Sequence, residues 1–132
     1  MSHRILICDD EPHIALAVGM KFKNAGYQVQ TARNGQEAWE SILRDAPNLL
    51  ITDCTMPRMD GVELCRRIRM LPNLQCMPIF LLTARGLELD PFVINEELRI
   101  SKLILKPFSP RELFRDVEKA LRLLPEAAGA TV

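Results

Sequence analysis

Several features are scarce or missing in this chain of 132 residues, and each one excludes a class of protein. No apolar run approaches the ~18 to 20 residues that a membrane-spanning helix needs. Lys and Arg number 17 and so do Asp and Glu, so no net positive charge is available to attract nucleic acid or anionic lipid. The four cysteines form no C-x-x-C pair, which argues against a metal site. We therefore expect a cytoplasmic protein with reduced cysteines that itself binds neither nucleic acid nor membrane.

The apolar content is nevertheless ordinary, since 48% of the residues are hydrophobic and 26% are charged. Such a composition supports a real hydrophobic core, and the length fits one domain rather than two. We assign residues 1–124 to this domain. Residues 125–132 show neither a strand pattern nor an amphipathic one, and we interpret them as a C-terminal tail or the start of a linker.

Short apolar runs alternate along the chain with longer stretches whose hydrophobic period is about 3.6 residues. The short runs span residues 5–8, 27–31, 49–52, 79–82 and 103–105. Four of them are almost wholly apolar, as are parallel strands buried on both faces, whereas residues 27–31 alternate and should form an edge strand. The pattern predicts an α/β fold, a doubly wound five-stranded parallel sheet with five helices on its two faces.

Capping sequences mark the starts of the predicted helices. Ser109, Asn34 and Asp60 are each followed three residues later by Glu, which is the spacing of a capping box. The fourth helix has the weakest pattern: Asp90 precedes a proline and should cap a short helix that ends near Leu98.

Polar residues follow four of the five predicted strands, at the edge of an open α/β sheet where ligands bind. Three aspartates, with Glu11 beside them, converge there with a hydroxyl and an ammonium group if the strands are parallel. These residues are Asp9, Asp10 and Glu11 after the first strand, Asp53 after the third, Thr83 after the fourth and Lys106 after the fifth.

Carboxylates brought to one point repel one another, and a hard divalent cation such as Mg²⁺ is the usual relief. A metal together with Lys106 would form an electrostatic clamp for a transferring phosphoryl group. Asp53 is then available as the nucleophile that forms an acyl phosphate, and Thr83 could donate to a phosphoryl oxygen. Each acid alone is equally well explained as a helix cap or part of a solvated turn. It is the combination at four strand ends that points to phosphoryl chemistry.

These residues stand in a familiar arrangement: Asp9-Asp10-Glu11-Pro12, the run D-C-T-M-P-R-M-D-G from residue 53 to residue 61, Thr83-Ala84 and Lys106-Pro107-Phe108. The chain closely resembles the receiver domain of two-component response regulators, over residues 4–124. The resemblance implies a flavodoxin-like sheet of strand order 2-1-3-4-5. It also implies a signalling domain that catalyses only its own phosphorylation and dephosphorylation, and is in that sense no enzyme.

The resemblance further implies that a histidine kinase or histidine phosphotransfer protein donates a phosphoryl group to Asp53, with Mg²⁺ or Mn²⁺ as cofactor. Asp10 and Asp53 would bind the metal directly, Asp9 would act on it through water, and the backbone carbonyl of Thr55 would add a ligand.

At the same site Lys106 would bind a phosphoryl oxygen, and its peptide bond to Pro107 would be cis. Thr83 would be the switch hydroxyl, drawn toward the new phosphate. Its partner position is Leu103, where receivers commonly carry Tyr or Phe.

A second departure from the family pattern is Arg99-Ile100 in place of the usual Gly-Ala, so helix four must end without its glycine. We expect ordinary phosphorylation chemistry and an individual output surface on helix four, strand five and helix five. An output domain or effector would bind there, or a second copy on phosphorylation. The apolar set that would serve this contact, or else belong to the core, is Leu89, Phe92, Val93, Ile100 and Leu103.

Two other functions stay open at this point. A small Mg²⁺-dependent phosphohydrolase would also use an aspartate nucleophile, but Asp9-Asp10-Glu11 lacks the D-x-D spacing typical of haloacid-dehalogenase-like phosphatases. A degenerate receiver would act as an interaction module independent of phosphate, and the intact set of Asp53, Thr83 and Lys106 argues against it.

Overall fold

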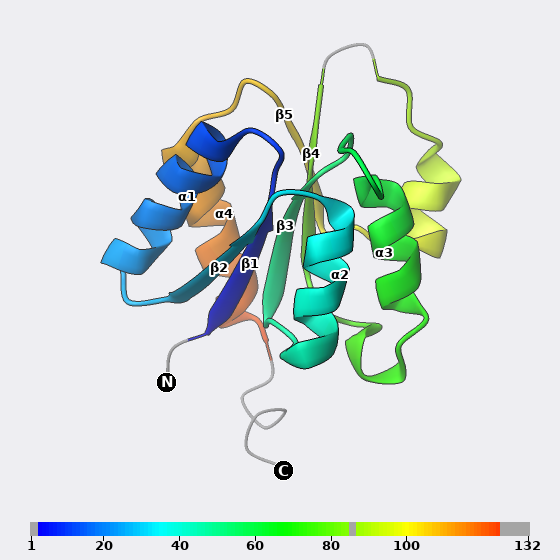
Figure 1. Cartoon of the computed structure of the whole chain (residues 1–132), viewed down its shortest axis with the longest axis horizontal. Coiled ribbons are helices and arrows are strands. Elements are labelled where there is room, and N and C mark those ends of the chain that lie inside the picture. Colours follow the sequence, from blue (N-terminus) through cyan, green and yellow to red (C-terminus); the bar gives the residue numbers. More distant parts are fainter. Residues whose placement is uncertain (1–2, 85–86, 125–132) are drawn as a thin grey trace.

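The computed structural model of this protein describes residues 3–84 and 87–124, so the predicted tail at 125–132 lies outside the described residues. Five parallel strands form one sheet in the order β2-β1-β3-β4-β5 (Figure 1), as predicted. Their bounds are Arg4–Cys8 for β1, Gln28–Ala32 for β2, Leu49–Asp53 for β3, Ile79–Thr83 for β4 and Lys102–Leu105 for β5. The alternating strand β2 lies at an edge, and every residue of β3 and β4 is buried.

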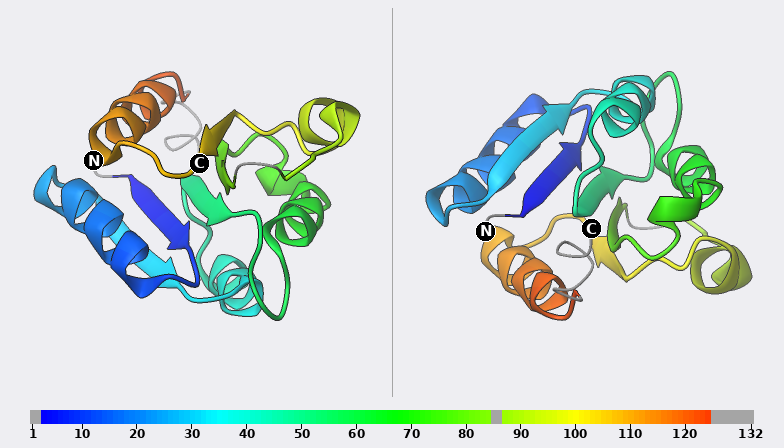
Figure 2. Two further views of the ribbon diagram at one scale, coloured as in Figure 1. Left: turned by 90° about the horizontal axis from the view of Figure 1, so that it is seen from above. Right: turned by 90° about the horizontal axis from the view of Figure 1, so that it is seen from below.

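Helices cover both faces of the sheet, which makes the fold doubly wound (Figure 2). The helices α1 and α4 pack on one face, and α2, α3 and a short segment, η2, lie toward the other. These elements correspond to the five predicted helices. Their bounds are Pro12–Asn24 for α1, Gly35–Arg44 for α2, Gly61–Arg69 for α3, Val93–Glu97 for η2 and Pro110–Arg122 for α4, with a further 3-10 turn η1 at Pro72–Leu74.

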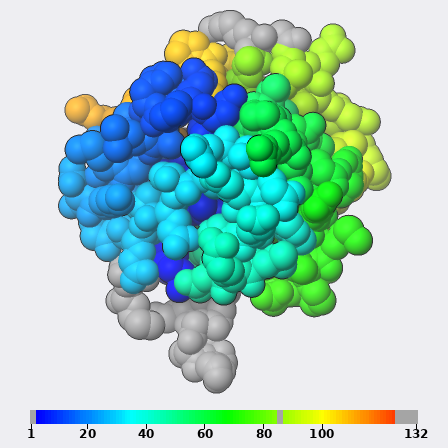
Figure 3. Space-filling model, viewed as in Figure 1, coloured from blue at the N-terminus to red at the C-terminus, as the bar shows by residue number. Residues whose placement is uncertain are grey.

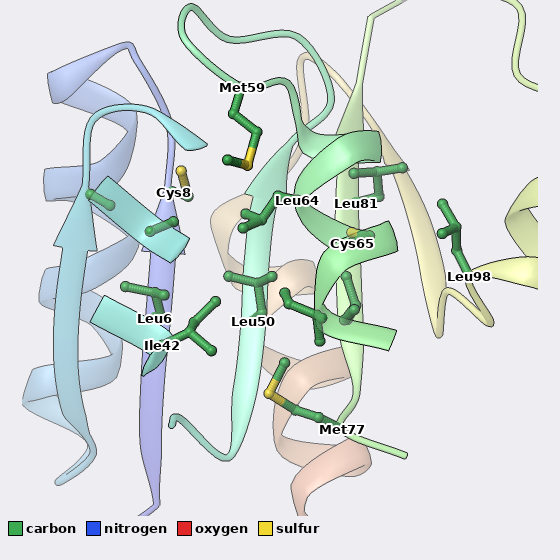
Figure 4. Packing of buried hydrophobic residues seen from close by; sticks show 14 of the residues in the cluster. Leu6, Cys8, Ile42, Leu50, Met59, Leu64, Cys65, Met77, Leu81 and Leu98 are labelled. Atoms are coloured by element: carbon green, nitrogen blue, oxygen red, sulfur yellow. The ribbon is translucent and has the colours of Figure 1, made fainter. Parts of the chain in front are cut away.

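The core is divided by the sheet into two clusters because successive strand side chains point to opposite faces. Leu6, Leu50 and Leu81 belong to the cluster under α2 and α3, which Figure 4 shows from close by. Ile7 and Ile51 belong to the cluster under α1 and α4. The strand centres are thus held from both sides, which fixes the positions of the residues that follow them.

The predicted helix caps are present. The Glu37 N–H donates to Asn34 Oδ1 at 2.9 Å, and the Glu63 N–H donates to Asp60 Oδ1 at 2.8 Å. The same bond joins the first turn of α4 to Ser109, at 3.2 Å. These local bonds place the starts of three helices next to the strand ends that precede them.

The fourth helix begins and ends as predicted, since residues 91–97 are helical, but the segment Val93–Glu97, η2, forms a π-helical turn. Asp90 Oδ1 accepts from the N–H of Phe92 at 2.9 Å. After the turn, Arg99 takes the left-handed backbone conformation that glycine usually adopts, with φ 52°. This conformation costs an L-residue roughly 1–2 kcal/mol. The absence of glycine at residue 99 therefore does not prevent the closure of the turn but makes it strained.

A buried arginine from α3 stabilises this closure. The guanidinium of Arg69 donates to the carbonyls of Leu98 and Leu74, both at 2.7 Å, and to that of Arg99 at 3.2 Å. These carbonyls lie at or just beyond the ends of η1 and η2, where regular helical hydrogen bonds run out. Burial lowers the pKa of Arg69, but arginine starts so high that it stays charged.

Three of the four cysteines are buried, whereas Cys76 is exposed. Cys54 packs into the cluster under α2 and α3, so its side chain is part of the core. Burial raises the pKa of Cys8 to about 12, that of Cys54 to about 11 and that of Cys65 to about 12. These three thiols are therefore protonated at neutral pH and shielded from reagents.

Replacement of Arg69 by Met should lower the free energy of unfolding by about 2–3 kcal/mol, because the carbonyls of Leu98, Leu74 and Arg99 lose the hydrogen bonds from the guanidinium. Urea denaturation of the wild type and the variant measures this difference. Arg67→Met is the control, since Arg67 is partly exposed and contacts Glu63 and the Trp39 ring at the surface. Equal losses in the two variants would contradict a special role for Arg69.

Titration with a disulfide reagent at neutral pH should label one thiol per folded molecule, and it should label all four in urea. The Cys76→Ser variant should show almost no fast labelling in the folded state. Rapid modification of Cys54 in the folded protein would contradict its assignment to the core.

Candidate functional site

The polar residues predicted at the strand ends meet at one edge of the sheet, the upper edge in Figure 1. Asp9, Asp10 and Glu11 connect β1 to α1, while Asp53 and Thr83 are the last residues of β3 and β4. Lys106 follows β5 directly. All four strand ends that were predicted to contribute do so.

Four carboxylates gather here. Asp9, Asp10, Glu11 and Asp53 each offer one oxygen atom, and these atoms all lie within 4.8 Å of one another. Asp9 and Asp53 are buried, whereas Asp10 and Glu11 are exposed to solvent. Oxygen ligands at this density, partly open to water, suit a hard divalent cation such as Mg²⁺.

Lys106 holds three of these carboxylates together. Its Nζ lies 3.0 Å from Asp53 Oδ2, 3.1 Å from Asp9 Oδ2 and 3.1 Å from Glu11 Oε1. Burial by itself would lower the pKa of Lys106, but the hydrogen bonds to the three carboxylates outweigh it and the pKa is raised. The ammonium group is therefore a permanent positive charge at the centre of the site.

The charge of Asp9 is only partly compensated. Burial raises the pKa of Asp9, and hydrogen bonds from the Glu11 N–H and the Lys106 ammonium offset this in part. The nearby charge of Asp53 acts in the same direction as burial. A second cation beside these carboxylates would stabilise their ionised forms, so the donor set fits a metal.

Thr83 carries a buried hydroxyl with no hydrogen-bond partner within the part of the chain that the structure describes. Such orphaned buried groups are rare because the lost hydrogen bonds to water are costly. The residue ends β4, next to β3, whose last residue is Asp53. The hydroxyl is thus a donor without an acceptor at the edge where the carboxylates gather.

The loop after β3 is closed tightly around the backbone of Asp53. The Gly61 N–H donates to the carbonyl of Cys54 at 2.8 Å, and the Thr55 N–H lies 3.4 Å from Asp53 Oδ1. A Cβ atom at Gly61 would lie 2.1 Å from the Asp53 carbonyl oxygen, so only glycine fits. Gly35, at the start of α2, is equally tight against the carbonyl of Met59 in the same loop.

The remaining sequence predictions concern the peptide bond after Lys106 and the apolar output set. The Lys106–Pro107 peptide bond is cis, as the resemblance implies. Leu103 lies on β5 and is 42% exposed, and Phe92 is 66% exposed. The remaining members of the predicted output set are half-buried against the core, so that set divides between surface and core; they are Leu89, Val93 and Ile100.

One contact had no counterpart in the sequence reasoning. Glu11 appeared there as a third acid after the first strand without a role of its own, and the structure bonds it to Lys106. The two residues are 95 positions apart. The only available signal was that both residues follow strands that end at the same edge of the sheet.

A search for membrane-spanning helices in residues 3–84 and 87–124 finds none with the required length and hydropathy.

Comparison with known proteins gives a consistent result. The family model described as the response regulator receiver domain matches residues 5–118. The alkaline phosphatase synthesis transcriptional regulatory protein PhoP of Bacillus subtilis (strain 168) is 36% identical over 122 residues. That match covers 92% of this chain and 50% of the relative, so the chain spans about half the length of this curated relative.

Solved structures agree with the fold. The receiver domain of a signal transduction histidine kinase from Syntrophus aciditrophicus has 32% identity and a TM-score of 0.81, and the match covers 95% of this chain and 94% of that one. The chemotaxis protein CheY4 of Vibrio cholerae has 26% identity and a TM-score of 0.80, with coverage of 90% and 98%.

Replacement of Gly61 by Ala should lower the free energy of unfolding by about 1–3 kcal/mol, because the added methyl group overlaps the backbone of Asp53. Gly19→Ala is the matched control. Its Cβ would meet Val29 at an ordinary 3.4 Å, and alanine within a helix is favoured over glycine by roughly 0.5–1 kcal/mol. Urea denaturation should move in opposite directions for the two variants, and a stable Gly61→Ala protein would contradict the close packing of this loop.

Proposed function

The chain belongs to the response regulator receiver domain family, and from this premise we propose that it accepts a phosphoryl group on Asp53 from a phosphohistidine. The donor is a histidine kinase or a histidine phosphotransfer protein. The chain is thus a signalling domain rather than an enzyme that turns over an external substrate. We place its activity in the cytoplasm, and we take residues 1–124 as the domain.

The observation that carries the proposal is the grouping of Asp53 with Lys106 and three further carboxylates at the strand ends. In the proposed reaction an Asp53 carboxylate oxygen attacks the phosphorus atom. The phosphorus–nitrogen bond of the phosphohistidine breaks, its electron pair stays on the imidazole nitrogen, and an acyl phosphate remains on Asp53. The half-buried Lys106 ammonium offsets the negative charge that gathers on the phosphoryl oxygens.

The carboxylate cluster also supports a Mg²⁺ or Mn²⁺ site in this reaction. Asp10 and Asp53 would bind the metal directly, Asp9 would act through water and the Thr55 carbonyl would add a ligand. When bound, the cation supplies charge neutralisation to the phosphoryl oxygens. The partial compensation of the Asp9 charge supports this proposal, since it leaves room for a second cation.

Thr83 is proposed to report the new phosphate. Its unpartnered hydroxyl would donate to a phosphoryl oxygen, and this bond would draw the end of β4 toward Asp53. β4 pairs with β5, where Leu103 lies opposite Leu81 and Leu105 lies opposite Thr83. A shift of Thr83 would therefore also move the paired strand β5 and its exposed residues Leu103 and Leu105.

The surface that would change is formed by η2, β5 and α4. Phe92, Leu103 and Leu105 are exposed there. We propose that an output domain or an effector binds this surface, or that a second copy does so on phosphorylation. Because Leu103 replaces the aromatic residue usual in receivers, the rearrangement here cannot be the rotation of a ring at that position.

Incubation with acetyl phosphate or a phosphohistidine donor in Mg²⁺ should add one phosphoryl group per chain, measured by intact-protein mass. Asp53→Asn should abolish the adduct because it removes the nucleophile, and chelation of the metal should do the same. Asp45→Asn, which changes an exposed carboxylate paired with Arg4, is the control and should be phosphorylated normally.

Two results would overturn this function. The absence of an adduct from both donors would favour an interaction module that works without phosphate. Repeated turnover of a generic phosphate ester would favour a phosphohydrolase.

A further inference from the structure

Lys106 has no free hydrogen-bond donor in the unphosphorylated domain. An ammonium group carries three N–H donors, and three carboxylate oxygens lie 3.0–3.1 Å from Nζ. A phosphoryl oxygen on Asp53 would be a fourth acceptor. Lys106 must therefore release one of its three present acceptors, which are Asp9, Glu11 and Asp53 itself, before it can bind the phosphoryl group.

The three carboxylates differ in how firmly they are held. The Asp9 side chain is 0% exposed, and its other oxygen accepts from the Glu11 N–H at 2.9 Å. Asp53 is the residue that would receive the phosphoryl group, and it is nearly buried, with 11% of its side chain exposed. The Glu11 side chain is 48% exposed, and its second oxygen lies 3.9 Å from His13 Nε2 on the solvent side. Of the three carboxylates, Glu11 therefore loses the least free energy when its hydrogen bond to Lys106 is replaced by hydrogen bonds to water.

The position of Glu11 in the fold is a second, independent observation. Glu11 is the N-cap residue of α1, yet among the described residues its side chain caps no helix N–H group. The caps of α2, α3 and α4 all use their side chains, and these are Asn34, Asp60 and Ser109. Glutamate is also absent from the group of preferred N-cap residues. The start of α1 therefore lacks a side-chain cap, because the Glu11 carboxylate is bonded to Lys106 instead. Positions where a residue does not suit its local structure are often functional.

We propose that Glu11 is a competing acceptor that limits phosphorylation: its carboxylate occupies one donor of Lys106 and must be displaced by the incoming phosphoryl oxygen. This inference rests on the proposed function and specifies how the same site is regulated. Glu11 also adds a negative charge beside the phosphoryl group. Both effects lower the affinity of the site for a phosphoryl group and slow its transfer to Asp53.

The test is the affinity of the protein for beryllofluoride, a phosphoryl analogue, in Mg²⁺. If a charged group that competes for one hydrogen bond of Lys106 is removed, the dissociation constant of the ligand should change by about 5- to 10-fold. The dissociation constant should fall by about this factor in Glu11→Ala and Glu11→Gln, and the rate constant for phosphorylation by acetyl phosphate should rise in parallel. Calorimetric titration and mass spectrometry measure the two quantities.

The matched control is Glu112→Gln, which removes a first-turn carboxylate from α4 just as Glu11→Gln removes one at the start of α1. It should leave the beryllofluoride affinity unchanged. A third readout needs neither metal nor donor: the exchange of the Lys106 ammonium hydrogens with water, observed by NMR, should be faster in Glu11→Ala. A purely structural role of Glu11 would not alter this exchange.

The outcomes separate this inference from the proposed function. If the wild type binds beryllofluoride and both Glu11 variants bind it equally well, the role of Glu11 is overturned and the proposed function stands. If Glu11→Gln weakens Mg²⁺ binding as strongly as Asp9→Asn does, Glu11 is a metal ligand, which also overturns it. If the wild type neither binds beryllofluoride nor becomes phosphorylated, the proposed function fails and the inference fails with it.

Discussion

The mutual repulsion of carboxylates at one end of a parallel sheet is the constraint around which this protein is built. The strand order brings Asp9 and Asp53 to the same edge, and their burial removes the water that would otherwise screen them. Lys106, which follows β5 at the edge of the sheet, offsets this repulsion because its ammonium group contacts both Asp9 and Asp53. The stability of the site thus depends on a residue that follows the last strand of the sheet.

The hydrophobic core on both faces of the sheet holds the strand ends in fixed positions. Both faces of β3 and β4 are covered, and the space-filling view in Figure 3 shows α2 and α3 closely packed over one side of the molecule. The absence of a side chain at Gly61 lets the start of α3 pack against the backbone of Asp53, and the absence of one at Gly35 lets the loop after β3 pack against the start of α2. Charges that repel one another can be held together because the segments carrying them have little freedom to separate.

Much of this organisation follows from local sequence. Strands buried on both faces need continuous apolar runs, and a helix cap needs Ser, Asn or Asp followed by Glu, so these elements could be predicted from spacing. The polar residues at the strand ends, such as Asp9, Asp53 and Lys106, could be assigned to one site because parallel strands end at the same edge. What could not be predicted depends on packing between distant segments. The contact of Glu11 with Lys106 and the burial of Arg69 beside the end of η2 are of this kind, as is the π-helical form of η2.

The helix α3 contacts the end of β3 at one of its ends and the end of η2 at the other. Its first residue, Gly61, lies against the backbone of Asp53, and its last, Arg69, holds the carbonyls that end η2. Midway, Arg66 is paired with Glu97 of η2 at 2.7 Å. The helix therefore joins the backbone of Asp53 to the end of η2 by an unbroken series of contacts, and this series is separate from the strand pairing that joins Thr83 to β5.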